Sequence, residues 1–213
     1  MSDALSEMVS DHQPRAVVFD VGQVLYRWSL RHLFAQLIDD SRELDWFLAN
    51  VVTEEWHFQH DAGRPLDDMV PELQAQYPDH AHLVEAYRRR FNETIPGPVP
   101  GTHELARKLS ERGVPLFGLT NFGDEFWGPF RQTAPVFDLF DDVVVSGTEG
   151  CAKPDSQIYA LAERRFGHAP QDLFFIDDRA ENIAAARARG WLGHVFADAG
   201  GLESDLKRHG LLD

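Results

Sequence analysis

Three short apolar runs in this sequence each end in polar residues, and this arrangement constrains the fold more than any other feature. The runs end at Phe19, Leu119 and Ile176, and the residues that follow them are Asp20, then Thr120 and Asn121, then Asp177 and Asp178. Such runs, rich in β-branched and aromatic residues, are typical of strands buried on both faces of a parallel sheet. The carboxyl ends of parallel strands meet at one edge of the sheet, so we expect these polar side chains to lie together.

Beyond residue 100, predicted strands alternate with predicted helices. Strands are expected at residues 115–120, 142–146, 173–177 and 194–196, and helices at about 102–112, 124–132, 155–166, 181–189 and 202–207. Thr102 is expected to cap the first of these helices, and Gly113, Gly167 and Gly190 each follow a helix as its stop. The alternation predicts an α/β protein with a parallel sheet, right-handed crossovers and helices on both faces.

Residues 28–95 interrupt this alternation. Apolar residues recur there at helical spacing, for example at Leu30, Leu33 and Phe34, and no convincing strand is present. The block reads as a small helical insertion after the first strand, closed by the Pro/Gly-rich segment 95–101, which suits a hinge. The expected organisation is a flexible tail at 1–14, a core made of residues 15–27 and 96–213, and the helical insertion at 28–95.

Charge and composition exclude several classes of function. The formal net charge of the 213 residues is -15, which argues against a nucleic acid or an anionic membrane as partner. No stretch approaches the length of a membrane span, and residues 1–14 lack the basic residues and apolar run of a signal peptide. Cys151 is the single cysteine, so no intrachain disulfide can form. We expect a cytoplasmic protein, monomeric or homodimeric, that acts on a small molecule.

The carboxylates at the strand ends are candidates for catalysis and metal binding. Asp20 can act as a nucleophile or a metal ligand, although a single aspartate at a strand end can equally cap a turn. The adjacent carboxylates of Asp177 and Asp178 repel each other unless a cation or hydrogen bonds neutralise them. A hard cation such as Mg²⁺ suits these oxygen ligands, whereas an exposed acidic turn at a helix start is the alternative.

Three further residues can bind an anion beside these carboxylates. Thr120 and Asn121 can donate hydrogen bonds to phosphate oxygens, and Lys153 offers a point charge to a phosphate or to Asp20. Each also has an ordinary explanation, as turn residues or as a solvated lysine. Taken together, carboxylate, hydroxyl, lysine and acidic pair can form a metal-dependent phosphoryl-transfer site.

The order of these segments resembles the four motifs of the haloacid dehalogenase superfamily. The matching segments are Phe19-Asp20-Val21-Gly22-Gln23-Val24-Leu25, Leu119-Thr120-Asn121, Lys153-Pro154 and Ile176-Asp177-Asp178-Arg179-Ala180-Glu181-Asn182-Ile183. They span nearly the whole chain, and the helical insertion stands where this superfamily carries a helical cap. The resemblance implies a Rossmann-like core and an aspartyl-enzyme intermediate.

The resemblance also implies a role for each matched residue. Asp20 would attack phosphorus, and Mg²⁺ would be held by the Asp20 carboxylate, the Gly22 carbonyl and Asp178, with Asp177 close by. Thr120, Asn121 and Lys153 would hold the transferring phosphoryl oxygens. Asn182 stands where many relatives carry an acidic group. The implied activity is Mg²⁺-dependent hydrolysis of a small phosphorylated metabolite.

One position departs from the phosphatase pattern of the superfamily. Gly22 stands where typical phosphatases carry a second aspartate as general acid and base. Dehalogenases also lack that aspartate, but they usually show Asp-x-Tyr-Gly-Thr and a serine-rich fourth motif, which are absent here. The form Asp-x-Gly-x-Val resembles a subgroup that includes bacterial sugar-phosphate phosphatases, so a sugar phosphate is the candidate substrate. A 2-haloacid dehalogenase and a catalytically weak binding or regulatory protein remain the alternatives.

The helical insertion contains one polar and aromatic cluster, residues 56–61. Its histidines, His57 and His60, could face the active site, bind a sugar or supply the missing acid. Packing within a helical hairpin is the alternative explanation for both.

Overall fold

The protein is built around one parallel sheet of five strands. The computed structural model describes residues 13–213, so most of the tail expected at 1–14 lies outside the described residues. The strands are β1 (Ala16–Phe19), β4 (Leu116–Thr120), β5 (Asp142–Val145), β6 (Leu173–Asp177) and β7 (Leu192–Val195). Their spatial order is β5-β4-β1-β6-β7, and every neighbouring pair is parallel. Strand β1 is therefore central, and Asp20 follows it directly.

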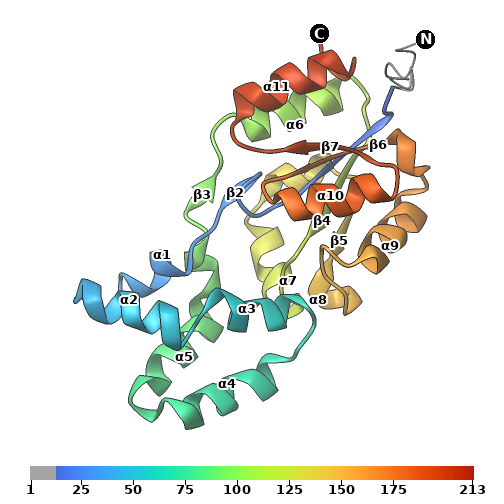
Figure 1. Cartoon of the computed structure of the whole chain (residues 1–213). Helices are drawn as coiled ribbons and strands as arrows, with labels where there is room; N and C mark the ends of the chain where they lie inside the picture. Colours follow the sequence, from blue (N-terminus) through green and yellow to red (C-terminus); the bar gives the residue numbers. More distant parts are fainter. Residues whose placement is uncertain (1–12) are drawn as a thin grey trace, which may run out of the picture.

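Helices cover both faces of this sheet, which explains why the strands are apolar throughout. Helices α6 (Thr102–Glu111) and α11 (Ala199–Arg208) lie on one face, and α9 (Ser156–Phe166) and α10 (Ala180–Ala188) lie on the other (Figure 1). Val17 and Phe19 of β1 pack into the core on the α6 side, whereas Ala16 and Val18 pack toward α9. All four side chains are fully buried, as expected for a strand covered on two sides.

The remaining core elements connect the strands, and most lie close to the ranges expected from sequence. They are α7 (Asp124–Gln132), η3 (Pro135–Leu139), α8 (Ser146–Glu149) and η4 (Pro170–Asp172). Asp155 caps α9 by accepting a hydrogen bond from the amide of Gln157, and Gly167 ends the helix with a φ of 68°. The expected capping role of Thr102 is wrong. Gly101 is the N-cap with a φ of 85°, and the Thr102 hydroxyl instead donates to the carbonyl of Val99.

A helical lobe is inserted between two short strands, β2 (Tyr26–Arg27) and β3 (Gly97–Pro98). These strands pair antiparallel, so the chain enters and leaves the lobe side by side. The lobe lies next to the sheet domain and away from the C-terminus (Figure 1). Its elements are α1 (Leu30–Phe34), α2 (Ser41–Asn50), α3 (Glu54–Asp61), α4 (Leu66–Gln76), η1 (Pro78–His80), α5 (Ala81–Arg90) and η2 (Phe91–Thr94).

The helical lobe also contacts the core away from β2 and β3. The ring of Phe91 stacks on that of Phe126 in α7, with centroids 3.9 Å apart. The buried hydroxyl of Ser146 in α8 donates to the carbonyl of Asp61 and accepts a hydrogen bond from the amide of Phe122. Aromatic packing and a buried hydrogen bond therefore hold α3 and η2 against the core.

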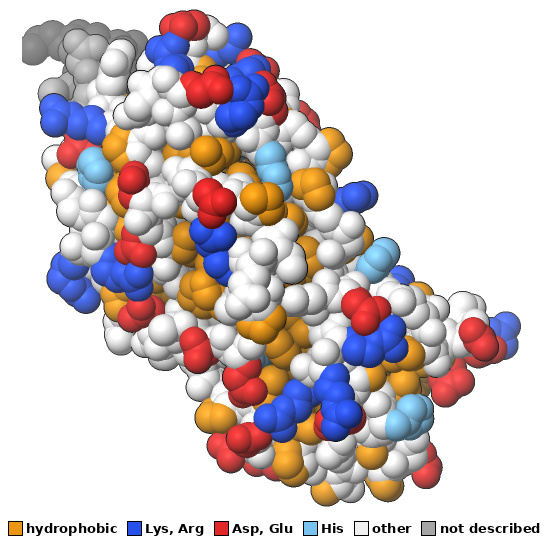
Figure 2. Space-filling model, turned by 180° about the vertical axis from the view of Figure 1, so that it is seen from behind, with side chains coloured by type: hydrophobic (Ala, Val, Ile, Leu, Met, Phe, Trp, Pro, Cys, Tyr) orange, Lys and Arg blue, Asp and Glu red, His pale blue; other side chains and the backbone are white. Residues whose placement is uncertain are grey.

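Charged side chains are mixed over the molecular surface. Acidic and basic groups alternate over both the core and the helical lobe on the face shown in Figure 2. Several charged side chains form exposed ion pairs, such as Arg131 with Asp138 at 2.8 Å. Among residues 13–213, no helix is both long and apolar enough to cross a membrane.

Candidate active site

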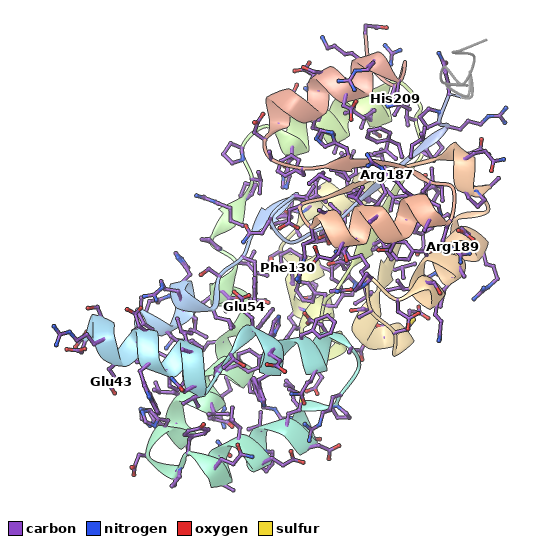
Figure 3. All side chains as sticks on the ribbon, in the orientation of Figure 1. Glu43, Glu54, Phe130, Arg187, Arg189 and His209 are labelled. Carbon is purple, nitrogen blue, oxygen red and sulfur yellow. The ribbon has the colours of Figure 1, made fainter. Side chains whose placement is uncertain are left out.

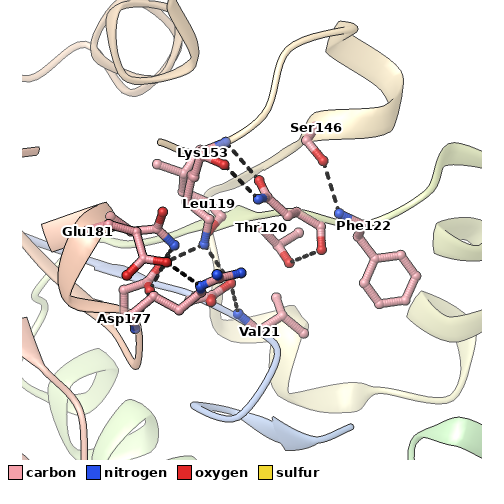
Figure 4. Close-up of polar contacts among 12 residues, drawn as sticks. Val21, Leu119, Thr120, Phe122, Ser146, Lys153, Asp177 and Glu181 are labelled. Carbon is pink, nitrogen blue, oxygen red and sulfur yellow. Dashed lines mark hydrogen bonds and ion pairs between the residues drawn. The ribbon is translucent and has the colours of Figure 1, made fainter. Parts of the chain in front are cut away.

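One buried lysine joins the ends of strands β1 and β6. The Lys153 ammonium nitrogen Nζ lies 2.8 Å from Oδ1 of Asp20 and 2.7 Å from Oδ2 of Asp177. It also donates to the carbonyl of Leu119 at 2.9 Å, and it lies over the ring of Phe175. The three N–H groups of the ammonium therefore each have an acceptor, which compensates for its burial. Figure 4 shows Lys153 together with Leu119 and Asp177.

Asp20 is held in place by its own backbone as well as by Lys153. Its amide donates to the carbonyl of Ile176 at 2.9 Å, and its Oδ1 accepts a hydrogen bond from the amide of Val21 at 2.7 Å. The residue is 7% exposed and lines the cavity described below. Its position immediately after a fully buried strand thus presents a carboxylate to the cavity from a rigid support.

The pKa of Asp20 is raised to about 7, mainly by burial and also by the neighbouring Asp177 and Asp178, against the opposing effect of Lys153. The pKa of Asp178 is also raised, first by burial and then by Asp177. The two carboxylates of Asp20 and Asp177 hold the pKa of Lys153 above its usual value despite its burial, so Lys153 stays cationic. Three carboxylates against one cation leave an excess of negative charge.

This excess of carboxylates fits a divalent cation. Asp20, Asp177 and Asp178 each place a ligand oxygen within 4.8 Å of the others. Oxygen donors of this kind match the preference of Mg²⁺, and a bound cation would relieve the repulsion that adds to burial in raising the pKa values of Asp20 and Asp178. Asp20, Gly22 and Asp178 line the cavity, whereas Asp177 does not.

The side chain of Asp177 binds neighbouring protein groups and does not line the cavity. It is fully buried, and besides Lys153 its carboxylate accepts hydrogen bonds from the amide of Arg179 and the side-chain nitrogen of Asn182. These contacts use both of its oxygens. Asp177 therefore orients Lys153 and the start of α10, and the sequence pattern alone could not separate this role from that of Asp178.

Thr120 and Asn121 lie beside the lysine, but their side chains are turned toward the protein. Asn121 donates from Nδ2 to the carbonyl of Lys153 and accepts at Oδ1 from its amide, both at 2.9 Å. This pair of hydrogen bonds fixes the Lys153 loop to the end of β4. Thr120 is 1% exposed, and its hydroxyl lies 3.4 Å from the carbonyl of Asn121. Of the two residues, only Asn121 lines the cavity.

A cavity of about 660 Å³ lies between the sheet edge and the helical lobe. Its core wall carries the charged and polar residues already described, and its opposite wall comes from the helical lobe and the segment after β2. Glu54, at the start of α3, lies near the junction of lobe and core, whereas Glu43 of α2 lies far out on the lobe (Figure 3). The lobe side of the lining consists of Trp28, Glu54, Glu55, His57, Phe58, Asp61, Phe91 and Ile95.

The two histidines singled out by sequence occupy different environments. His57 lines the cavity, and both of its ring nitrogens have partners within the lobe. His60 does not line the cavity. Its ring packs edge-on against Phe126, and its Nδ1 contacts the carbonyl of Arg64 at 2.8 Å. Because its ring packs against Phe126 of α7, His60 is separated from the cavity and is not part of the candidate site.

Sequence reasoning missed several residues of this region. Tyr87 contacts His57 from α5, thirty positions away in the chain, and Ser146 joins the lobe to the core. Trp28 lines the cavity from the segment after β2. None of the three stands in a recognisable motif, and only the packing of the helices brings them to the site.

The arrangement of sheet, strand-end carboxylates and buried lysine defines an enzyme class, and comparison with known families agrees with it. The model of the haloacid dehalogenase-like hydrolases matches residues 14–190. The chain therefore belongs to the haloacid dehalogenase-like hydrolase family.

Relatives with assigned activities include phosphatases. A sesquiterpene phosphatase of Aspergillus oryzae is 27% identical over 186 residues, which is 87% of this chain and 91% of that enzyme. A phosphoglycolate phosphatase of Pseudomonas putida is 26% identical over 110 residues, which is 52% of this chain and 40% of that enzyme.

Solved structures show the same fold at low sequence identity. A magnesium complex of a family enzyme from Bacteroides thetaiotaomicron aligns with a TM-score of 0.69 and 20% identity, covering 92% of this chain and 99% of that one. The L-2-haloacid dehalogenase of Xanthobacter autotrophicus, with chloropropionic acid covalently bound, aligns with a TM-score of 0.59 and 17% identity over 94% of this chain and 85% of that one.

Proposed function

We propose that the protein is a Mg²⁺-dependent phosphatase that hydrolyses a small phosphorylated metabolite through an aspartyl-phosphate on Asp20. The observation that carries this proposal is the Asp20 carboxylate, fixed at the end of the central strand and paired with the buried cation of Lys153 at 2.8 Å. A nucleophile, a cation and an excess of carboxylates share one cavity edge. The phosphatase relatives support this reading.

Each residue then has a role consistent with its position. One oxygen of Asp20 forms a bond to phosphorus while the ester bond to the leaving alcohol breaks, and water later hydrolyses the aspartyl-phosphate to release phosphate. Lys153 offsets negative charge beside the reacting group, and Asp177 and Asn121 position Lys153. Asp20, Asp178 and the Gly22 carbonyl would hold Mg²⁺, which supplies further charge neutralisation when bound.

The helical lobe, residues 28–95, would act as a cap that closes over the substrate. Its connection through the adjacent strands β2 and β3 suits a hinge, and α3 lines the cavity opposite Asp20. Closure would exclude water from the reacting phosphoryl group and bring residues of the lobe onto the leaving group.

A phosphate-release assay on glucose 1-phosphate and p-nitrophenyl phosphate, with Mg²⁺ and with EDTA, tests this proposal. We expect release that requires Mg²⁺ and is absent in the Asp20→Asn variant. Metal-independent halide release from 2-chloropropionate would instead identify a dehalogenase. Binding of phosphate esters without turnover would identify a binding or regulatory protein.

A further inference from the structure

A chain of polar contacts runs through the helical lobe and ends at the cavity wall. The hydroxyl of Tyr87 in α5 lies 2.7 Å from Nδ1 of His57, and Nε2 of His57 lies 3.2 Å from Oδ2 of Asp61. The His57 ring also stacks on Trp28 and on Phe91. All three members of the chain are buried, which means that their orientation is set by packing.

The donor in the contact between Tyr87 and His57 follows from the protonation of the Tyr87 hydroxyl. Burial raises the pKa of Tyr87 well above its usual value, so its hydroxyl keeps its proton. Among the described residues, His57 is the one acceptor for that proton, so Nδ1 accepts it. The Nε2 atom of His57 then lies 3.2 Å from Oδ2 of Asp61 on the other side of the ring. This assignment leaves His57 without a free nitrogen for the general-acid role that the sequence suggested.

Two buried polar atoms lie in or beside this chain of contacts. Oδ1 of Asp61 and Nε1 of Trp28 are both buried, and neither has a hydrogen-bond partner among residues 13–213. Asp61 is 6% exposed, and both residues line the cavity that contains Asp20. A carboxylate oxygen buried without a donor is costly, and the other oxygen of Asp61 lies against His57. One buried acceptor and one buried donor thus belong to residues that line the same cavity as the nucleophile.

We infer that Asp61 and Trp28 form a subsite for a hydroxyl-bearing leaving group, with Asp61 accepting from a substrate hydroxyl and Trp28 donating to a substrate oxygen. This inference rests on the proposed function, because it assigns the alcohol part of the phosphate ester to the lobe side of the cavity. The neighbouring Phe58 and Phe91 offer apolar surface for the carbon skeleton of a polyol or sugar.

The charge of this wall narrows the substrate class further. Helix α3 contributes Glu54 and Glu55 to the cavity besides Asp61, so its contribution is acidic. The cationic Arg27 and Arg179 line other parts of the cavity. Carboxylates repel an anionic leaving group and tolerate a neutral one. A neutral polyhydroxylated alcohol therefore fits better than a carboxylated one such as glycolate. A purely apolar leaving group would leave the Asp61 oxygen unsatisfied.

Matched pairs of substrates test the subsite. Glucose 1-phosphate is compared with cyclohexyl phosphate, and glycerol 3-phosphate with propyl phosphate, since each second member lacks the free hydroxyls. In wild type with Mg²⁺, we expect kcat/KM to favour at least one hydroxylated member. In Asp61→Asn that preference should fall by roughly 10- to 100-fold, the size of one lost hydrogen bond to a charged group.

Two further variants separate recognition from folding. Asp68→Asn removes an exposed carboxylate of α4 and should leave the substrate preference and the basal turnover unchanged. Trp28→Phe removes the indole N–H but keeps an aromatic ring against His57, so it should lower the same preference ratio. It provides the readout if Asp61→Asn does not fold. An unchanged ratio in a folded Asp61→Asn or Trp28→Phe protein overturns the inference.

A binding measurement tests the subsite independently of the proposed phosphatase activity. In the Asp20→Asn background, calorimetry should show at least one hydroxylated ester binding more tightly than its matched partner, and Asp61→Asn should remove that difference. Turnover of p-nitrophenyl phosphate without any hydroxyl preference would reject the subsite and retain the phosphatase. Hydroxyl-dependent binding without turnover of any ester would retain the subsite and reject the phosphatase.

Discussion

The Lys153 ammonium lies 2.8 Å from Oδ1 of Asp20, and both side chains are almost fully buried. The same ammonium lies 2.7 Å from Asp177, so one cation neutralises the carboxylates at the ends of two neighbouring strands. Lys153 therefore affects both the stability of the fold and the proposed catalysis. Its contacts join the ends of two strands, and its positive charge lies beside the Asp20 carboxylate.

Replacing Lys153 by Met should destabilise the protein by about 3–5 kcal/mol, since it leaves buried carboxylates without their cation. Urea denaturation in EDTA measures this change. Lys108→Met is the matched control, because Lys108 forms an exposed ion pair with Glu203 at 3.4 Å and its removal should cost less than about 1 kcal/mol. Equal losses for the two variants would contradict a structural role for the buried pair.

Replacing Asp20 by Asn should lower kcat by at least about a thousandfold, because the amide cannot act as the nucleophile. The fold should persist, since the amide keeps the shape of the side chain and can still accept from Val21. Steady-state phosphate release beside circular dichroism tests both points. A folded Asp20→Asn protein with near wild-type turnover would exclude the covalent mechanism.

Mg²⁺ affinity should depend on pH because of the raised pKa of Asp20, about 7 in the metal-free protein. Below that pH the carboxyl group is protonated, so a proton must leave before the metal binds. The dissociation constant for Mg²⁺ should therefore rise by up to about tenfold per pH unit below 7 and level off above it. Calorimetric titrations between pH 5.5 and about 8.5 measure this. Asp178→Asn should weaken binding across the whole range, and a flat profile in wild type would contradict the raised pKa.

Replacing Ser146 by Ala should destabilise the protein by about 1–3 kcal/mol, because Ser146 is fully buried and bridges the lobe to the core. The alanine leaves the carbonyl of Asp61 and the amide of Phe122 without this partner. Thermal and urea unfolding test the change against Ser156→Ala, which alters an exposed serine at the start of α9. If both variants unfold alike, the bridge contributes nothing.

Introducing aspartate at Gly22 should increase turnover of esters with poor leaving groups. A Cβ built at Gly22 meets no atom within 4 Å, and the backbone there has no positive φ, so the side chain fits. The new carboxyl group could protonate the departing alkoxide, an effect that typically contributes roughly 10²–10⁴-fold. Rates for a series of aryl and alkyl phosphates should then depend less on leaving-group pKa. Gly22→Asn is the control, and a similar gain with it would exclude proton transfer.

Several parts of the architecture could be predicted because their signals are local. The strand ending at Phe19 has both faces buried, so its apolar run is continuous, and the glycine after α9 has the positive φ that ends the helix. The sequence does not predict strands β2 and β3, because two residues are too few to show an alternation of apolar and polar side chains. Thr102 was given the wrong role because the sequence does not reveal that Gly101 adopts the left-handed conformation.

The sequence by itself determined the parallel sheet, the helical insertion and the set of residues gathered at the sheet edge. Each apolar strand is followed directly in the sequence by the polar residues at its carboxyl end, so both are visible in local patterns. Tertiary structure decided which side chains face the cavity. Asp177 and Asn121 turn to hold Lys153, and His60 packs against the core. Asp61 lies against His57, which in turn contacts Tyr87, and one oxygen of Asp61 has no hydrogen-bond partner among residues 13–213. These choices depend on how α3, α5 and α7 pack against one another, and such long-range contacts leave no local pattern in a sequence.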